Sequence, residues 1–468
     1  MASIFVARAS ANAVPIWFVT AQSYPEVRKL IGAEACAFAD AAGFEPKAGR
    51  HLLLPGKAGH QGGLKGGLNG GLGGVLFGLE GAGEPKDMFL PGRLVQHLPD
   101  GVYRFANEPH DARLAALAFA LGLYRFTRYR KAEARNISLD LPQSVDRDDL
   151  ARIVEGVTLA RDLINTPAND MGPAELEDAA RKLAARHGAS ISAVVGDDLL
   201  KQNFPLIHAV GRAATGAPRL IDMSWGEASH PRVTLVGKGV CFDTGGLDIK
   251  PDASMLNMKK DMGGAATALA LAHMIMAHGL DVRLRVLIPA VENSIAGGSF
   301  RPRDIYTSRK GMTVEVGNTD AEGRLILADA LALADEEKPD LIGDFATLTG
   351  AARVALGPEV APFFTDDDAL AGELMQCAAT ENDPLWRLPL WRPYESMLES
   401  KVADTNNVGG GQAGAITAAL FMRRFVTVKS WLHVDLFAWT PMAKPGRPEG
   451  GECQAARALF AVLAARYG

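Results

Sequence analysis

The sequence has few cysteines and no long apolar segment, and both absences restrict the kind of protein it encodes. Four cysteines occur in 468 residues, and none has the C-x-x-C spacing. This argues against a disulfide framework and against a zinc site built from cysteine. No run reaches the roughly 18 uncharged apolar residues that a membrane-spanning helix needs. The first residues also lack a basic stretch followed by a sustained apolar one, so we expect a cytoplasmic protein without a membrane partner.

Neither positive nor negative charge is in large excess. The chain carries 49 basic and 54 acidic residues, which gives a formal net charge of −5. Proteins that bind nucleic acid or anionic membranes usually carry a basic surplus, so we do not expect nucleic acid as a partner. The hydrophobic fraction of 48% and the charged fraction of 22% are those of an ordinary globular protein, which excludes a mainly disordered chain.

The chain divides into two parts of different character. We predict a smaller amino-terminal α/β domain over residues 1–140 and a larger α/β/α domain over residues 150–468. The polar residues 131–149 are interpreted as the link between them. Residues 56–83 form a glycine-rich tract that could cradle a phosphate. Because the tract lacks the GxxxxGK(S/T) pattern, we interpret it as a mobile or turning connection.

Helical and strand patterns alternate after residue 150. Apolar spacing predicts helices at 148–164, 173–188, 263–278 and 325–337, besides one at 114–130 in the first part. Short apolar strands are predicted at 190–195, 219–225, 232–236, 282–291 and 340–348, with an irregular loop at 237–260. This alternation is typical of a mostly parallel central sheet covered by helices on both faces. Sites in such sheets lie at the carboxyl ends of strands, here the loops after residues 236, 291 and 346.

Two regions, residues 235–266 and 316–330, place charged side chains among glycines. The residues that could carry chemistry are Lys238, Asp243, Lys250, Asp261, Asp320, Glu322 and Arg324. Four carboxylates in one pocket raise one another's pKa, and one or two divalent cations would remove that conflict. Oxygen ligands favour Mg, Mn or Zn. For Asp320 and Glu322 an ordinary helix-capping role is the alternative interpretation.

The three cations each have two interpretations. Lys238 stands between glycines directly after an apolar strand, where burial would lower its pKa and let a neutral amine bind a metal. A salt bridge to one of the acids explains the same position equally well. Lys250 and Arg324 could stabilise negative charge that develops on a carbonyl oxygen, or could neutralise surplus acids. No GxSxG motif occurs, and His433 alternates with apolar residues in a predicted strand, which indicates a core or edge histidine.

Together, the two regions resemble the leucyl (cytosol) aminopeptidase family. The motifs that carry the resemblance are VGKGVCFDTGG with MKKDMGGAA, and NTDAEGRLILADA, of which NTDAEGR is the family's signature. The resemblance covers roughly residues 155–468. The family usually reads FDSGG where this chain has Thr244, a mild departure that leaves Asp243 in place.

This resemblance implies a site for two metal ions. It implies that the tighter ion is held by Lys238, Asp243, Asp261 and Glu322. It implies that the exchangeable ion is held by Asp243, Asp320 and Glu322, with the backbone carbonyl of Asp320 as a further ligand. Zn or Mn is expected, with Mg or Co as alternatives.

The resemblance also implies the other parts of an active site. Lys250 and Arg324 match the family's catalytic cations, and Arg324 with the turn at Leu348 would bind a bicarbonate ion. The positions that line the pocket for the first side chain are Met258, Thr347 and Gly350.

The function implied is a metal-dependent aminopeptidase, active as a homohexamer on peptides with a free amino terminus. It would prefer apolar first residues such as Leu and would use a metal-bridging water with bicarbonate as the general base. A two-metal hydrolase of another class, such as a phosphoesterase, is one alternative. A catalytically silent binding protein on the same fold is another. The presence of all seven matched residues argues against the silent protein.

Overall fold

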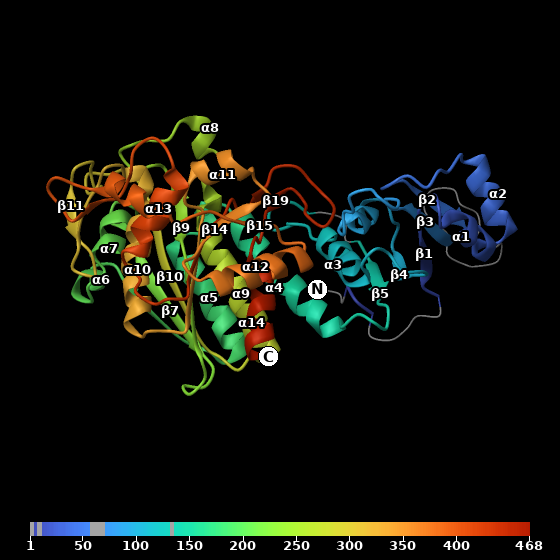
Figure 1. Cartoon of the computed structure of the whole chain (residues 1–468), viewed down its shortest axis with the longest axis horizontal. Coiled ribbons are helices and arrows are strands. Elements are labelled where there is room, and N and C mark those ends of the chain that lie inside the picture. The colour runs from blue at the N-terminus through green and yellow to red at the C-terminus, as the bar shows by residue number, and fades with distance from the viewer. Residues whose placement is uncertain (1–3, 7–11, 57–70, 132–134) are drawn as a thin grey trace. The chain divides into compact units, whose positions relative to one another are not determined.

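The computed structural model describes residues 4–6, 12–56, 71–131 and 135–468, which belong to two compact units. One unit comprises Met1–Val154 with Met442–Glu449, and the other comprises Glu155–Pro441 with Gly450–Gly468. Each contains its own sheet with helices packed against it (Figure 1). The predicted fold class, a smaller amino-terminal α/β domain followed by a larger α/β/α domain, is confirmed.

The amino-terminal unit is built on a five-stranded sheet with the order β2-β3-β1-β4-β5. Its strands are β1 (Val14–Val19), β2 (His51–Pro55), β3 (Leu72–Gly78), β4 (Gly101–Phe105) and β5 (Ile137–Asp140). Its helices are α1 (Tyr24–Ile31), α2 (Ala33–Ala41), the 3-10 helix η1 (Leu90–Gln96) and α3 (Ala112–Gly122). Only the β2–β3 pair is antiparallel among the pairings of these strands. Val27 and Ala39 of the first two helices pack with Val19, Leu54 and Leu76 of the sheet.

Part of the glycine-rich tract is a strand, which corrects its interpretation as a connection. Residues 72–78 form β3, paired on both sides, whereas residues 57–70 lie outside the described part of the chain. A Cβ atom on Gly73 would lie 2.5 Å from the carbonyl oxygen of Pro55, and one on Gly78 would collide with the carbonyl group of Lys47. Glycine therefore allows close approach of neighbouring backbone here, at positions that no other residue could occupy.

Two boundaries in this unit also differ from the prediction. The helix expected at 114–130 ends at Gly122. The segment interpreted as a polar link contains β5, which pairs with β4 at the edge of the sheet. Strand β5 is only four residues long and is flanked by polar residues. Its alternation of apolar and polar side chains is therefore too short to recognise in the sequence.

The larger unit is built on a nine-stranded sheet with the order β15-β14-β17-β13-β8-β10-β7-β6, to which β9 is joined through β10. The strands are β6 (Ser190–Val195), β7 (Arg219–Trp225), β8 (Arg232–Gly237), β9 (Gly239–Asp243), β10 (Arg283–Asn293), β13 (Leu341–Ala346), β14 (Ala361–Phe364), β15 (Leu385–Arg387) and β17 (Trp431–Asp435). The central strands β17, β13, β8 and β10 run parallel. A three-stranded sheet contains β11 (Ile305–Thr307), β12 (Thr313–Glu315) and β16 (Thr405–Asn406). A two-stranded sheet pairs β18 (Trp439–Thr440) with β19 (Gly450–Gly451).

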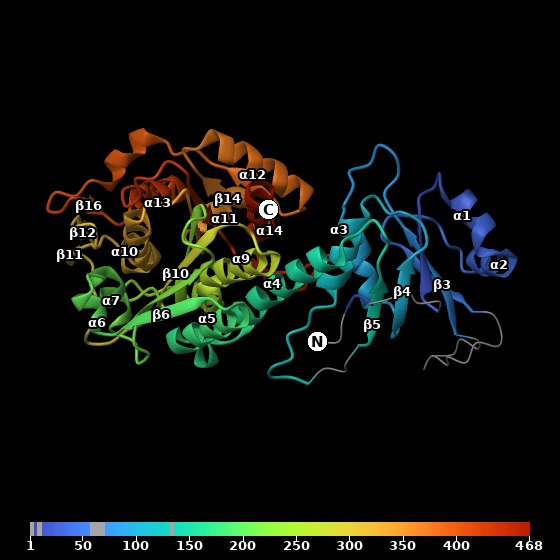
Figure 2. The ribbon, with the colours of Figure 1, turned by 90° about the horizontal axis from the view of Figure 1, so that it is seen from below.

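Helices cover both faces of this sheet (Figure 2). One layer contains α5 (Pro173–His187), α9 (Gly263–His278), α12 (Asp368–Thr380) and α14 (Ala456–Tyr467). The other contains α7 (Pro205–Gly211), α10 (Glu322–Glu336) and α13 (Gly414–Arg423), whose apolar side chains share one core with the strands. Further helices are α4 (Arg147–Asn165), α6 (Asp198–Lys201), α8 (Asp252–Met255) and α11 (Gly350–Leu356). Within the described residues, no helix combines the length and the apolar character needed to cross a membrane.

Near the loops of interest, the structure refines the predicted elements. Residues 237–260, expected as an irregular loop, contain β9 and α8. The helix expected from residue 325 begins at Glu322, so that Glu322 and Arg324 belong to its first turn. It is preceded by the 3-10 turn η4 (Thr319–Ala321), where the side chain of Asn318 accepts a hydrogen bond from the backbone N–H of Asp320. This capped entry turns both acidic side chains toward the same side of the helix start.

A buried polar triad ties two central strands together. His433 Nδ1 lies 2.6 Å from Asp344 Oδ1, and Trp431 Nε1 donates to Asp344 Oδ2 at 2.8 Å. All three side chains are fully buried, which confirms His433 as a core histidine.

We expect Asp344→Ala to lower the free energy of unfolding by about 3–5 kcal/mol, because two buried donors would lose their acceptor. Urea unfolding followed by tryptophan fluorescence measures the change. Asp368→Ala is the matched control, since that side chain is 89% exposed and pairs with Arg387 at the surface; a loss below about 1 kcal/mol is expected there. Equal losses in the two variants would contradict the role of the triad.

Candidate active site

The candidate residues gather at the carboxyl ends of the central strands. Lys238 directly follows β8, Asp243 ends β9, and Thr347 follows β13. Asp261 comes from the 3-10 helix η3 (Met258–Met262), which leads into α9. Parallel strands end at one edge of the sheet, so residues more than 100 positions apart meet there, as the sequence predicts.

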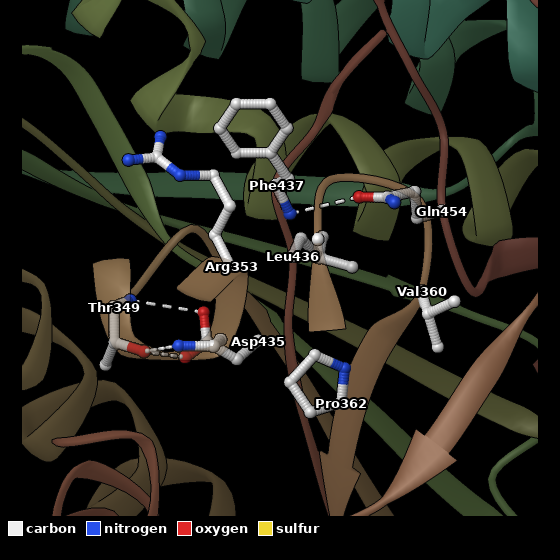
Figure 3. A pocket seen from close by; sticks show the side chains of 10 residues that line it. Thr349, Arg353, Val360, Pro362, Asp435, Leu436, Phe437 and Gln454 are labelled. Atoms are coloured by element: carbon white, nitrogen blue, oxygen red, sulfur yellow. Dashed lines mark hydrogen bonds between the residues drawn. The ribbon is translucent and has the colours of Figure 1, made fainter. Parts of the chain in front are cut away.

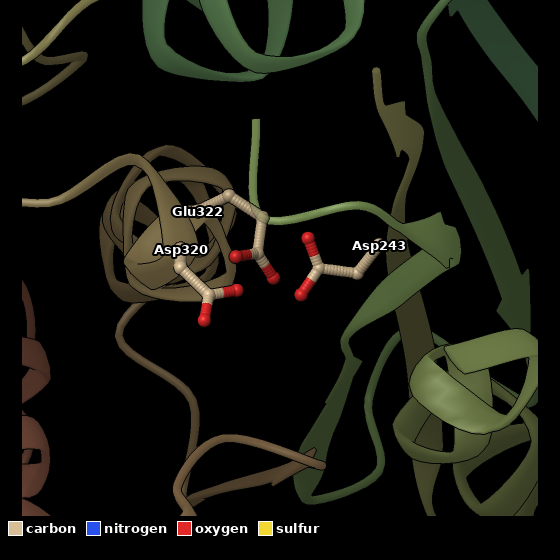
Figure 4. Close-up of side chains that lie close together, drawn as sticks. All are labelled: Asp243, Asp320 and Glu322. Carbon is tan, nitrogen blue, oxygen red and sulfur yellow. The ribbon is translucent and has the colours of Figure 1, made fainter. Parts of the chain in front are cut away.

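Three carboxylates point toward a common centre (Figure 4). Asp243, Asp320 and Glu322 each offer one oxygen, and these atoms lie within 4.8 Å of one another. Burial, together with the charge of Asp243, raises the pKa of Glu322 to about 8 and that of Asp320 to about 6. Burial also acts to raise the pKa of Asp243, but Lys250 and Lys238 outweigh it and lower that pKa. The three acids cannot all ionise freely unless positive charge is added. A divalent cation would supply that charge and stabilise the ionised carboxylates.

Lys238 is buried between acids. Its Nζ lies 2.8 Å from Asp261 Oδ2 and 2.9 Å from Glu322 Oε1, and it donates to the carbonyl oxygen of Thr347 at 3.0 Å. Burial acts to lower the pKa of Lys238, but the charges of Asp261, Glu322 and Asp243 outweigh it and raise that pKa. Of the two interpretations of Lys238, the ion pair is therefore the one this structure contains. A cation added among the same acids would act in the opposite direction and favour the neutral amine.

Three buried carboxylate oxygens have only a lysine ammonium group as a neighbouring partner. Asp261 Oδ2, Asp320 Oδ1 and Glu322 Oε1 are buried and receive no well-directed hydrogen bond. Each is close to a lysine ammonium group instead. Buried carboxylate oxygens that face only an ammonium charge are suitable ligands for Mg, Mn or Zn, so the residues present fit a metal centre.

Glycines in the two motifs make this close packing feasible. A Cβ atom on Gly323 would lie 2.6 Å from Cε and 2.8 Å from Nζ of Lys238. One on Gly264 would collide with the carbonyl oxygen of Phe345 and lie 2.9 Å from the backbone nitrogen of Lys238. The glycines of NTDAEGR and MGGAA therefore leave the space that the lysine occupies.

Lys250 approaches the carboxylate cluster from the long loop after β9. Its Nζ lies 2.8 Å from Asp243 Oδ2 and also pairs with Asp320 Oδ1. Asn293, at the end of β10, donates through Nδ2 to Asp243 Oδ1 at 2.8 Å and to the carbonyl oxygen of Thr319 at 3.0 Å. Sequence reasoning directed attention to the loop after this strand but singled out no residue in it. The position of Asn293 at the end of a buried strand was the available signal.

Arg324 is a buried cation with hydrogen-bonding capacity left over. It is 8% exposed, its Nη1 donates to the carbonyl oxygen of Asn407 at 2.7 Å, and its Nε has no partner. Burial lowers the pKa of Arg324 to about 10, against the opposing charges of Asp435 and Glu322. The acids that act on it electrostatically are Asp435 and Glu322, and within the described part of the chain neither forms an ion pair with it. A buried guanidinium with a free N–H fits a small anion.

The turn after β13 is fixed by a residue that the sequence did not single out. Asp435 Oδ1 accepts hydrogen bonds from the backbone N–H groups of Leu348 and Thr349 at 3.0 and 3.2 Å. Asp435 Oδ2 accepts from Thr349 Oγ1 at 2.6 Å. Asp435 lies at the end of β17, next to β13 in the sheet. Pairing across strands therefore explains its effect on a turn 87 residues away.

Among the residues expected to line a side-chain pocket, Thr347 contacts a residue of the site. Met258 begins the 3-10 helix that carries Asp261, and Thr347 Oγ1 donates to Asp261 Oδ1 at 2.8 Å. Gly350 opens α11, where a Cβ atom would meet open space. Figure 3 shows a pocket beside the turn after β13, lined by Thr349, Arg353, Asp435, Phe437 and Gln454 among others. The backbone N–H groups of Phe437 and Ala438 both donate to Gln454 Oε1 at 3.0 Å.

Fold and site together define an α/β protein with a buried carboxylate centre suited to divalent metal ions. Family models match both units: "Cytosol aminopeptidase family, catalytic domain" over residues 158–460 and "M17 aminopeptidase, N-terminal domain" over residues 14–142. The chain belongs to the cytosol aminopeptidase family of metal-dependent exopeptidases.

Individual relatives agree with the family match. A probable cytosol aminopeptidase of Roseiflexus castenholzii is 42% identical over 361 residues, which cover 73% of this chain and 74% of the relative. One of Chlamydia abortus is 45% identical over 290 residues, covering 61% of this chain and 58% of the relative.

Solved structures extend the likeness to the whole chain. The crystal structure of cytosol aminopeptidase from Coxiella burnetii has a TM-score of 0.92 and 45% identity, and the match covers 100% of both chains. The bottromycin maturation enzyme BotP in complex with Mn has a TM-score of 0.85 and 31% identity, covering 97% of this chain and 100% of that chain.

Proposed function

We propose that this metal-dependent aminopeptidase uses two divalent ions held in the carboxylate cluster to remove the first residue of peptides. The observation that carries the proposal is the convergence of Asp243, Asp320 and Glu322 on one centre, with Lys238 and Asp261 directly beside it. One ion would be held by Lys238, Asp243, Asp261 and Glu322. The other would be held by Asp243, Asp320 and Glu322, with the Asp320 carbonyl.

When bound, such ions lower the pKa of a water molecule and polarise the carbonyl group of the scissile bond. We propose that the two ions are Zn or Mn, with Mg or Co as alternatives. The Mn in the BotP complex supports the choice of a hard divalent ion. In this proposal the negative charges of Asp243 and Glu322 serve both sites. The Asn293 side chain would hold Asp243 Oδ1 in place, since it donates to that atom at 2.8 Å.

Two cations of the chain would act directly on the substrate. Lys250 would donate to the carbonyl oxygen of the scissile bond as negative charge develops there. Arg324 would hold a bicarbonate ion through its unpaired N–H, positioned to accept the proton of the attacking water and return it to the leaving amine. Leu348 would contribute to the anion site through the turn that Asp435 holds, because its own N–H is donated to Asp435.

The finer properties of the proposal rest on the family resemblance and on residues near the cluster. Met258, Thr347 and Gly350 would line the pocket for the first side chain, and the thioether and methyl groups of the first two would accept apolar residues such as Leu. Discrimination by one methylene group is worth only about 1–3 kcal/mol, so the preference would be broad. The proposal also includes assembly as a homohexamer and a location in the cytoplasm. The names of the relatives support the location only.

We expect chelator-treated protein to lose leucine release from a Leu-dipeptide and to regain it with Mn, Zn, Co or Mg. N-acetyl-Leu-dipeptide should not be cleaved, because a blocked amine cannot bind as a free amino terminus. A phosphoester substrate run alongside tests the alternative hydrolase. Failure to restore peptide hydrolysis with any metal, in folded protein that binds two ions, would refute the proposed function.

A further inference from the structure

The loop that carries Lys250 has little apolar packing to hold it in place. It runs from Thr244 to Lys250, and its two large apolar side chains are exposed, Leu247 at 42% and Ile249 at 59%. At its end the backbone N–H of Lys250 donates to the carbonyl oxygen of Thr244 at 3.0 Å. Such a loop keeps one conformation where polar groups from neighbouring elements fix its backbone.

Thr319 supplies such a polar group. It precedes Asp320 in η4 and is fully buried. Its hydroxyl group donates to the carbonyl oxygen of Gly245 at 2.6 Å and accepts from the backbone N–H of Asp248 at 2.9 Å. A Cβ atom on Gly246 would lie 3.0 Å from the same hydroxyl oxygen, so the loop wraps closely around it. One hydroxyl group therefore bonds both a backbone acceptor and a backbone donor of the loop.

Asp248 returns this contact from the loop to the turn before α10. Its Oδ2 atom accepts from the backbone N–H of Thr319 at 2.7 Å and lies 3.2 Å from the hydroxyl oxygen. Asn293 Nδ2 donates to the carbonyl oxygen of Thr319 at 3.0 Å and to Asp243 Oδ1 at 2.8 Å, which ties the same turn to β10. The loop and the turn thus form one hydrogen-bonded unit, and the position of Lys250 depends on it.

We propose that Thr319 is a positioning residue for Lys250. Its hydroxyl group holds the loop 244–250 against the turn before α10, and this fixes where the ammonium group lies when it donates to the carbonyl oxygen of the scissile bond. The ion pairs with Asp243 and Asp320 do not fix that position, because the same carboxylates are proposed metal ligands. The inference rests on the role proposed for Lys250.

The test removes the hydroxyl group with little change in the shape of the side chain. Thr319→Val replaces it by a methyl group, whereas Thr319→Ser keeps it. We expect kcat for Leu-p-nitroanilide at saturating Mn to fall about 10- to 100-fold in Thr319→Val, because a small misplacement of a catalytic group has a cost of that order. KM should stay within about threefold, and Thr319→Ser should keep kcat within about threefold of the wild type.

Two comparisons decide whether the effect passes through Lys250. In the Lys250→Met background, Thr319→Val should lower kcat less than about threefold further, because the group that Thr319 positions is already gone. Thr417→Val is the matched control and should leave kcat unchanged. Thr417 lies in α13, is 1% exposed and donates through its hydroxyl group to the carbonyl oxygen of Gly414 at 3.2 Å.

Three results in folded Thr319→Val would overturn the inference. The first is a wild-type kcat. The second is an equal loss of kcat with and without Lys250. The third is a loss of bound metal, since Thr319 would then serve the neighbouring Asp320.

Hydrogen exchange separates this inference from the proposed function. Mass spectrometry of peptides that cover residues 244–250 needs no turnover, and these amides should exchange about tenfold faster in Thr319→Val than in the wild type or Thr319→Ser. Asp248→Ala, in the half-buried loop itself, should act in the same direction and replaces Thr319→Val if that variant does not fold. Unchanged exchange overturns the inference. A wild type that cleaves no peptide refutes the proposed function, and the exchange rates still decide whether Thr319 holds the loop.

Discussion

Replacement of Lys250 by methionine should lower kcat for Leu-p-nitroanilide by about 10²- to 10³-fold, the usual cost of removing one donor to a developing oxyanion. The side chain reaches Asp243 and Asp320 from a loop, and its Nζ lies 2.8 Å from Asp243 Oδ2. Removal of this positive charge should leave the acids at least as able to bind a divalent cation. The expected signature is therefore a folded protein that retains its metal and has lost turnover. Arg324→Met should lower kcat in the same way, because the anion would lose its cation.

The control for this prediction is a lysine in an ordinary surface ion pair. Lys201 pairs with Asp198, and its side chain is 74% exposed. Lys201→Met should leave kcat, thermal stability and metal content unchanged. Wild-type rates in well-folded Lys250→Met and Arg324→Met variants would remove both residues from the mechanism. Loss of metal together with loss of rate in Lys250→Met would instead assign that lysine to the metal centre.

The two motifs could be located from the sequence because each is local and each follows a recognisable element. The helix predicted at 263–278 has those boundaries in the structure, since an unbroken apolar stretch ends at Gly279 with its left-handed backbone. Lys238 could be assigned to the end of a strand because it directly follows a short apolar run in the sequence. The sequence could not decide between its neutral and paired forms, because that depends on the positions of Asp261 and Glu322 in space.

Residues that act across strands were not predictable in this way. Asp435 fixes the turn at Leu348 because β17 and β13 are neighbours in the sheet, which no local pattern reveals. Lys260 is one of two adjacent lysines in the sequence, and its burial distinguishes it from Lys259, which donates to the carbonyl oxygen of Asn165. The strand β3 was hidden because close backbone approach requires glycine, the residue that otherwise indicates a turn.

Glu322→Gln should lower kcat/KM by about 10³-fold and reduce metal content, because Glu322 belongs to both proposed ligand sets. A Lewis-acid centre supplies several kcal/mol of transition-state stabilisation, and each 1.36 kcal/mol corresponds to a factor of ten. Glutamine has the same size and removes the charge, so the fold should persist; Lys238 keeps its contact with Asp261 at 2.8 Å. Metal analysis after gel filtration and steady-state rates at saturating Mn measure the two effects.

The same variant should change how metal affinity depends on pH. The pKa of Glu322 is raised to about 8, so below that pH a proton occupies the carboxylate and competes with the metal. Wild-type affinity should therefore fall as the pH drops from 8 to 6, with Asp320 adding to the fall as the pH approaches its pKa of about 6. In Glu322→Gln the fall between pH 8 and 7 should become shallower, because glutamine has no proton to release, whereas Lys238 must still lose one to bind a metal. A competition titration with a chelator at each pH gives both slopes, and equal slopes in the two proteins would mean that Glu322 is not a ligand.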